Sequence, residues 1–90
     1  MSISVSSSLQ AATRQLLADA FGCALDEIPE DAALGSPAAW DSLGHMRLVL
    51  ALEEQTGRAL SPEEIAGIAE LADVEALLAR AITAAANERR

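Results

Sequence analysis

Several residue types that mark common functional classes are missing or scarce in this sequence. It contains no lysine, and six arginines stand against fourteen acidic residues, which gives a formal net charge of −8 at pH 7. Nucleic acids and anionic lipid surfaces bind through basic patches, so we expect neither as a partner. The acidity has two explanations that composition does not separate: docking onto basic patches of other proteins, or solubility alone.

Cysteine and aromatic residues are almost absent. Cys23 is the only cysteine, so no internal disulfide can form, as is usual in a reducing cytoplasm. Neither lysine nor a neighbouring histidine is present to activate the thiol, and we expect a buried or half-buried structural side chain.

No apolar run approaches the roughly 18 residues of a membrane span. The first ten residues lack the basic and apolar regions of a signal peptide. We therefore predict one cytoplasmic domain with no membrane partner.

Alanine, leucine, glutamate and arginine dominate the remaining composition, which favours helix. Apolar residues recur at helical spacing in 8–21, 42–55 and 73–87. A short helix fits "SPEEIAGI" (61–68), where Ser61 and Glu64 match a capping box and Pro62 suits the first helical position. These segments predict an all-α fold, a four-helix bundle with three main helices, one short helix and a long first loop. We expect a bundle domain over 8–86 and flexible ends at 1–7 and 87–90.

The helix ends and buried stripes follow from the same pattern. Ser7 or Ser8 can cap the first helix, and Gly22 and Gly57 fit the positions just after two helices. The expected apolar stripe of the first helix is Leu9, Ala12, Leu16, Leu17, Ala20 and Phe21, and that of the last helix is Val74, Leu77, Leu78, Ala81 and Ile82.

The connection over 23–40, "CALDEIPEDAALGSPAAW", contains Pro29, Gly35 and Pro37, so no long helix crosses it. Loops longer than about 12–15 residues in compact domains are functional or disordered. Spaced apolar residues favour an ordered loop packed on the core. The expected anchors are Ile28, Leu34 and Trp40.

The helix over 42–55 has two different sides when it is drawn at 100° per residue. One side is almost purely apolar and should face the core: His45, Leu48, Val49 and Leu52. The opposite side combines Leu43, Met46 and Leu50 with Arg47, Glu53 and Glu54. We expect these three apolar residues to be partly exposed, either as a docking ridge for a partner or by incidental exposure. A histidine on the core side is expected to be packed and hydrogen-bonded rather than catalytic.

Ser42 has two possible roles at the start of this helix. If the Asp41 carboxylate caps the helix, the Ser42 hydroxyl lies in the first turn and points outward. A phosphate ester on that oxygen would then be favoured by the backbone N–H groups and the helix dipole. Alternatively, Ser42 is itself an ordinary N-cap, which is the common function of a serine at such a position.

The motif "DSL" (41–43), followed by "GHMRLVLALEEQTG", resembles the acyl carrier proteins and the related peptidyl and aminoacyl carrier proteins. "LLADAFGCALDEIPEDAAL" and "LEEQTGRALSPEEIAGIAELADVEALLARAI" are similar to the family's other helices and loop. The resemblance implies a helical bundle on which a phosphopantetheinyl transferase, using Mg²⁺ of its own, places 4′-phosphopantetheine from coenzyme A. It implies attachment at Ser42, with Asp41 and Leu43 beside it.

The same resemblance implies a carrier without catalytic or metal-binding residues, which works with a loading enzyme and downstream acyl-processing enzymes. It implies partner docking at Leu43, Met46, Arg47 and Leu50. Core residues that a short acyl chain could approach are Val49, Leu52, Val74 and Leu78. We expect a monomer.

Two departures indicate a specialised pathway rather than housekeeping fatty acid synthesis. Carriers of fatty acid synthesis usually have a glycine two residues before the aspartate, where this chain has Ala39. They also carry acids along the following helix, where this chain has Gly44 and Arg47. "WDSLGHM" is more similar to dedicated carriers of polyketide, nonribosomal-peptide, aminoacyl or glyceryl transfer systems.

The sequence leaves two other functional classes as alternatives to the carrier. A carrier-like interaction module without a prosthetic group would bind partners through the ridge alone. A serine hydrolase of the Gly-Asp-Ser-Leu type would need a glycine where Trp40 stands, an exposed histidine base and an oxyanion hole. The only histidine is His45, on the expected core side.

Overall fold

The structure is a computed structural model that describes residues 5–88. Its elements are α1 (Val5–Phe21), a short 3₁₀ helix η1 (Leu25–Glu27), α2 (Ser42–Thr56), α3 (Pro62–Ala66) and α4 (Leu71–Glu88). Over these residues it contains no strand, only isolated bridges made by Ala33 with Ser36 and Glu70. The predicted all-α fold with three long helices and one short helix is confirmed.

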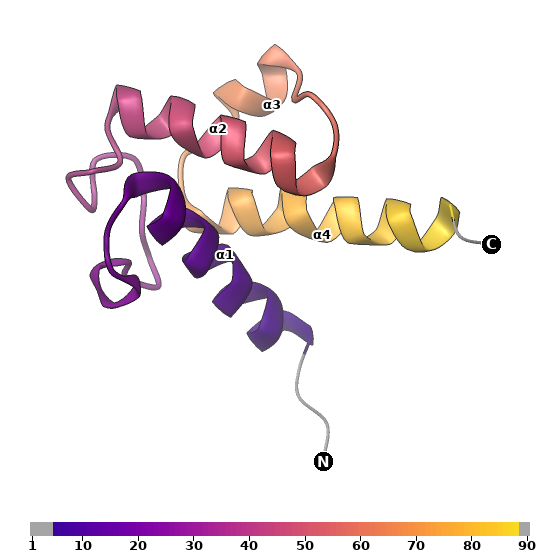
Figure 1. Cartoon of the computed structure of the whole chain (residues 1–90), viewed down its shortest axis with the longest axis horizontal. Coiled ribbons are helices and arrows are strands. Elements are labelled where there is room, and N and C mark those ends of the chain that lie inside the picture. Colours follow the sequence, from indigo (N-terminus) through magenta and orange to yellow (C-terminus); the bar gives the residue numbers. More distant parts are fainter. Residues whose placement is uncertain (1–4, 89–90) are drawn as a thin grey trace.

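The three long helices contact one another and enclose the core. Figure 1 shows α2 above α4, with α1 crossing beside both and α3 at the outer edge next to α2. Large fully buried side chains come from every long helix and from the first loop: Leu17, Ile28, Trp40, Leu48, Leu52 and Val74. Because the loop supplies two of these six side chains, the core that supports α2 is completed only when the loop is in place.

The helix ends differ from the expected ones by a few residues. Helix α1 begins at Val5, so Ser7 and Ser8 lie inside it and the predicted serine cap is wrong. No glycine or proline interrupts the residues just before Ser8, and the helix continues through them. Helix α4 begins at Leu71, two residues earlier than expected, and the Asp73 carboxylate in its first turn accepts from Ala69 N and Glu70 N. The expected domain limits at 7/8 and 86/87 stay predictions, and residues 1–4 and 89–90 lie outside the described residues.

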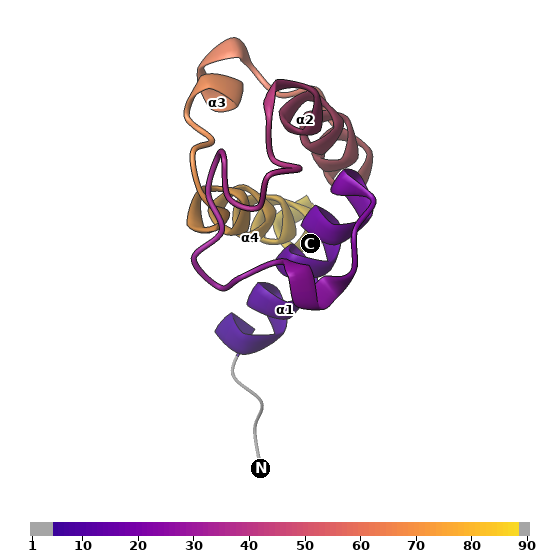
Figure 2. The same cartoon turned by 90° about the vertical axis from the view of Figure 1, so that its left-hand side faces the viewer.

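The loop over 22–41 is ordered, as expected, but its anchors are only partly as predicted. Ile28 and Trp40 are fully buried, whereas the Leu34 side chain is 55% exposed and is not an anchor. The loop is held there by its backbone instead, because Leu34 N donates to Ala69 O at 2.9 Å and Gly35 N donates to Trp40 O at 2.7 Å. Figure 2 shows the loop reaching the connection between α3 and α4.

Arg14 fixes the first part of this loop from α1. Its guanidinium donates to the Ile28 carbonyl from Nε at 3.0 Å and from Nη2 at 2.7 Å, and Nη2 also lies 3.3 Å from Leu25 O. These carbonyls belong to η1 and to the residue that ends it, which the sequence pattern had not predicted as helical. A charged donor thus satisfies the Ile28 carbonyl, while Leu25 O already accepts from Ile28 N within the short helix.

The apolar stripe of α4 is shorter than predicted. Val74, Leu77 and Leu78 are buried, but Ile82 is 60% exposed. The last turns of α4 extend beyond the end of α2 in Figure 1, so the periodic pattern continues past the helices that could cover it. No helix in the described part of the chain combines the length and apolar character that crossing a membrane requires.

Candidate functional site

The amino-terminal end of α2 is capped by Asp41 and not by Ser42. Asp41 has extended backbone angles, and its Oδ1 accepts from Gly44 N at 2.8 Å. Ser42 is therefore the first residue of the helix, and its side chain is exposed. The alternative that Ser42 is an ordinary N-cap is wrong, because the aspartate already satisfies the backbone donor that a cap would bind.

Gly44, noted in the sequence only as a departure from acidic carriers, has a structural role at this end of α2. It is buried, and a Cβ atom added to it would collide with the carbonyl oxygen of Ala39. The backbone before Ser42 therefore runs directly against the first turn of α2. A glycine inside a helix costs about 1 kcal/mol relative to alanine. That cost was the signal in the sequence that a close approach occurs here.

Trp40 and His45 link the loop to α2 on either side of Ser42. The indole Nε1 of Trp40 donates to His45 Nδ1 at 3.1 Å, and the two rings are nearly parallel with centroids 6.4 Å apart. His45 Nε2 lies 3.4 Å from the carbonyl oxygen of Ile65 in α3. The expectation of a packed, hydrogen-bonded histidine is confirmed. Both ring nitrogens face groups other than Ser42, so His45 is not placed to act as a base on that hydroxyl.

The outward side of α2 exposes the three apolar residues that the helical wheel placed there. Leu43 is 61% exposed, Met46 is 50% exposed and Leu50 is 63% exposed. Arg47 is exposed among them and forms no ion pair with any other described residue. From Ser42 to Leu52 the helix contains no acidic residue. In a chain of net charge −8, these three turns form an apolar surface with a single positive charge.

The short helix α3 reaches the amino-terminal end of α2 through the Ile65 carbonyl, and polar contacts help to hold it. Ser61 and Glu64 form the predicted capping box, with Ser61 Oγ accepting from Glu64 N at 3.1 Å and Glu64 Oε1 accepting from Ser61 N at 2.9 Å. Arg58 Nη2 is 2.8 Å from Glu64 Oε2, and Arg80 is 3.8 Å from the same oxygen. The hydrogen bond from Arg58 and that from the Ser61 backbone lower the pKa of Glu64 to about 2.

The remaining candidates for reactive chemistry are the single thiol and metal-binding clusters. Cys23 is a free, half-buried thiol, as expected, and desolvation together with the nearby Glu27 raises its pKa. Burial and a negative neighbour both disfavour the thiolate, so this thiol is a poor nucleophile. Within the described residues, no group of three or more histidine, cysteine or acidic side chains could hold a metal ion.

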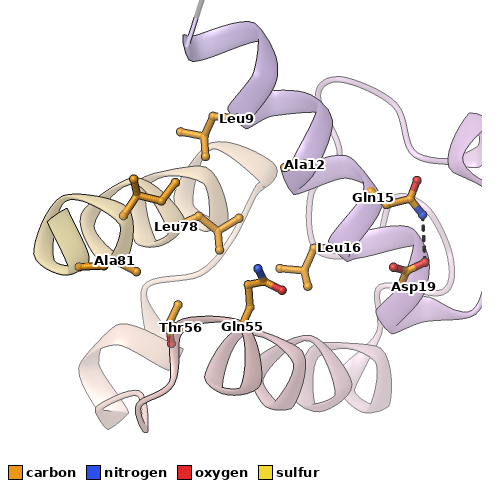
Figure 3. Close-up of a pocket in the computed structure, with 11 residues that line it drawn as sticks. Leu9, Ala12, Gln15, Leu16, Asp19, Gln55, Thr56, Leu78 and Ala81 are labelled. Atoms are coloured by element: carbon orange, nitrogen blue, oxygen red, sulfur yellow. Dashed lines mark hydrogen bonds between the residues drawn. The ribbon is translucent and has the colours of Figure 1, made fainter. Parts of the chain in front are cut away.

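A groove of about 450 Å³ opens between α1, α4 and the carboxyl-terminal end of α2. Figure 3 shows Leu9, Leu16 and Leu78 on its walls with Gln55 from α2. Gln55 is thirteen residues beyond Ser42, which at 1.5 Å per residue is about 20 Å along the helix axis. The groove is therefore separate from the amino-terminal end of α2.

Comparison with protein families decides what kind of domain this is. A family model described as the phosphopantetheine attachment site matches residues 11–78 of the chain. The chain belongs to this family. It is a carrier domain and not an enzyme, and domains of this family bear a covalently attached 4′-phosphopantetheine. Carrier domains interact with phosphopantetheinyl transferases and acyl-processing enzymes. Searches of curated proteins and of solved structures found no match.

The residues of this carrier domain fit such a group at the start of α2. Ser42 offers an exposed hydroxyl, and Asp41 leaves that hydroxyl free by capping the helix in its place. The first-turn backbone N–H groups and the helix dipole favour a phosphodiester there. Predicted site residues Asp41, Ser42 and Leu43 are thus together at one helix end, and Met46, Arg47 and Leu50 continue from them along α2.

Proposed function

We propose that this carrier domain holds acyl or aminoacyl intermediates on a 4′-phosphopantetheine arm attached to Ser42, in a specialised biosynthetic pathway. The single observation that supports Ser42 is its geometry: an exposed hydroxyl on the first residue of a helix that its neighbour Asp41 caps. When attached, the arm supplies a terminal thiol that carries acyl groups as thioesters.

Asp41 and Gly44 fix the backbone around the hydroxyl. The Asp41 carboxylate is bound to Gly44 N, and the missing side chain of Gly44 lets the backbone of Ala39 approach the helix. The serine is therefore presented on a rigid turn rather than on a mobile loop. A fixed hydroxyl loses less conformational freedom when a transferase binds it, which favours the reaction.

We propose that the outward side of α2 is the docking surface, made by Leu43, Met46, Arg47 and Leu50. The exposure of the three apolar residues supports this, because folding alone does not require them there. The free Arg47 and the absence of acids between Ser42 and Leu52 indicate a partner with an apolar surface that bears an acidic group. This polarity supports a dedicated loading enzyme, and hence a specialised pathway such as polyketide, nonribosomal-peptide or aminoacyl transfer.

We also propose that the domain acts as a monomer in the cytoplasm. The free Cys23 thiol suits a reducing compartment. The acidic surface, with a net charge of −8, disfavours close association of two copies.

The test is the intact mass of the protein before and after incubation with coenzyme A, Mg²⁺ and a promiscuous phosphopantetheinyl transferase. We expect a gain of one phosphopantetheine in the native chain, and no gain in Ser42→Ala. Ser36→Ala, which removes another exposed serine close to the site in sequence, is the matched control and should be modified normally.

The Ser42→Ala variant should also unfold at nearly the native temperature, since the cap is Asp41. Modification of Ser42→Ala would contradict the assignment of the site. A folded native chain of unmodified starting mass that gains nothing would favour the alternative, an interaction module that binds through the α2 surface without a prosthetic group.

A further inference from the structure

His45 makes the contact that joins the two sides of the attachment residue. Trp40 is fully buried, and its indole N–H donates to His45 Nδ1 at 3.1 Å. A ring nitrogen that accepts a hydrogen bond carries no proton, so the proton of the neutral imidazole lies on Nε2. Nε2 is 3.4 Å from the Ile65 carbonyl oxygen, to which it can then donate. One side chain therefore links the loop, α2 and α3.

The hydrogen bond between Trp40 and His45 restrains the segment that contains Ser42. Trp40 precedes Ser42 by two residues and His45 follows it by three, so the hydrogen bond closes a short loop that contains the attachment residue. The Asp41 cap fixes only the backbone of the first turn, from the Asp41 carboxylate to Gly44 N. The direction from which the chain enters the helix is fixed by Trp40, which is held by the core and by His45.

We infer that His45 is a positioning residue for the attachment reaction, acting through its Nδ1 acceptor on Trp40 to hold the Ser42 hydroxyl in one orientation. This inference rests on the proposed function of Ser42. His45 does not touch the reacting oxygen, since both of its ring nitrogens face other groups. Its contribution is to the geometry of the nucleophile, and small displacements of a reacting group lower rates substantially.

Two amide substitutions separate the two hydrogen bonds of the imidazole. In His45→Asn, the side-chain oxygen is as many bonds from the backbone as Nδ1 and can still accept from Trp40. In His45→Gln, the amide nitrogen is as many bonds away as Nε2 and can donate to Ile65 O, while the acceptor for Trp40 is lost. Glutamine is the better helix former of the two. Loss of helix stability would therefore harm the asparagine variant more, which is the opposite of the functional expectation.

The experiment measures the single-turnover rate of transfer from coenzyme A to Ser42 at saturating phosphopantetheinyl transferase. We expect the rate of His45→Gln to fall about fivefold, the factor that corresponds to loss of a typical hydrogen bond. The rate of His45→Asn should stay near that of the native chain. The concentration of transferase that gives half of the maximal single-turnover rate should not change in either variant, because the outward side of α2 is untouched.

The indole N–H signal of Trp40 supplies a second, independent measurement, since this is the only tryptophan. In an NMR spectrum the signal should stay downfield and slow to exchange in His45→Asn, and should move and exchange faster in His45→Gln. Thermal unfolding of both variants confirms that they are folded. Equal rates in the two variants, whether native or reduced, would overturn the inference while leaving Ser42 as the site. Failure of the native chain to be modified at all would overturn the proposed function, and this inference with it.

Discussion

Helices α2 and α3 are joined near the functional end by the contact between His45 and Ile65 O, but they are stabilised in different ways. Helix α2 has fifteen residues, of which Gly44, Leu48, Val49 and Leu52 are buried. Helix α3 has five residues and none of them is buried. It is held by the buried Leu60 before it and Ile68 after it, and by the polar contacts of Ser61, Glu64 and Arg58.

This difference indicates which element is rigid and which can adjust. Burial of apolar side chains gives α2 a stability that changes little with pH or salt. Exposed ion pairs and caps contribute less, and salt and acid weaken them. The attachment residue lies on the rigid helix, and α3 reaches the first turns of that helix through the contact between His45 and Ile65 O. Changes in α3 should therefore reach Ser42 through that contact.

The largest effect should come from the two sides of α2 itself. Leu52 is fully buried and Leu50 is 63% exposed, so the pair compares the same residue type on one helix. We expect Leu52→Ala to lower the free energy of unfolding by about 2–5 kcal/mol, through lost burial and a cavity. Leu50→Ala should change it by no more than about 0.5 kcal/mol. Denaturant unfolding measures both, and comparable losses in the two variants would contradict the rigid, one-sided packing of α2.

Gly44→Ala should have the next largest effect on the free energy of unfolding. We expect it to destabilise the fold, whereas the same substitution in an ordinary helix stabilises it. Replacing glycine by alanine inside a helix normally stabilises by about 1 kcal/mol. Here the new methyl group would meet the Ala39 carbonyl oxygen, so we expect a net loss of about 1–3 kcal/mol. The control is Ala51→Gly on the same helix, which should lose about 1 kcal/mol from propensity alone. A higher denaturation midpoint for Gly44→Ala would show that the close approach is absent.

The sequence was sufficient to predict features that depend on local chemistry. The capping box of Ser61 and Glu64 and the end of α2 at Gly57 follow from residue types at fixed spacing. The cap of α2 did not, because the sequence left Asp41 and Ser42 as alternatives and the structure decides for Asp41. The outward exposure of Leu43, Met46 and Leu50 follows from helical periodicity and is confirmed. Attachment at Ser42 and docking on this surface stay predictions.

Features that depend on tertiary contacts were not predictable in the same way. Leu34 and Ile82 have the apolar character of core residues, but the backbone hydrogen bonds of the loop and the length of α4 leave them exposed. Arg14 and Trp40 bind groups that lie far along the chain or across a turn. Periodicity describes one element at a time, so it does not show which element will cover a given side.

Substitution of Arg47 tests the exposed side of α2. We expect an intermediate effect on acyl transfer and little effect on the free energy of unfolding. Arg47→Glu would place an acid opposite the acidic group that we propose on the loading enzyme. We expect acyl transfer to the carrier to fall about tenfold at low salt, a coupling typical of charge pairs at interfaces, and the loss to shrink as salt is added. The measurement is the kcat/KM of the cognate loading enzyme, with the carrier as the varied substrate.

Arg80→Glu is the control, because it makes the same change of charge at an exposed position on α4. Arg80 also lies 3.8 Å from Glu64, so thermal unfolding of this variant checks that α3 stays in place. It should leave loading nearly unchanged. Equal losses in the two variants would mean that net charge, and not the polarity of the α2 surface, governs the encounter with the partner.

The smallest expected effect concerns α3 and acid. The hydrogen bond from Arg58 and the capping contacts with Ser61 hold the pKa of Glu64 at about 2, below its ordinary value of 4.5. A carboxylate whose pKa is lower in the folded than in the unfolded state stabilises the fold above the unfolded value. That contribution is lost as pH falls from 4.5 through about 2. Glu64→Gln keeps a side chain that suits a capping box but removes the charge. The unfolding temperature of the native chain should therefore exceed that of the variant at neutral pH, and the difference should shrink towards pH 2 and at high salt.

Glu63→Gln, an exposed neighbour on α3, supplies the control. A difference that stayed constant with pH would mean that α3 is held by packing, as α2 is, and the contrast between the two helices would not hold.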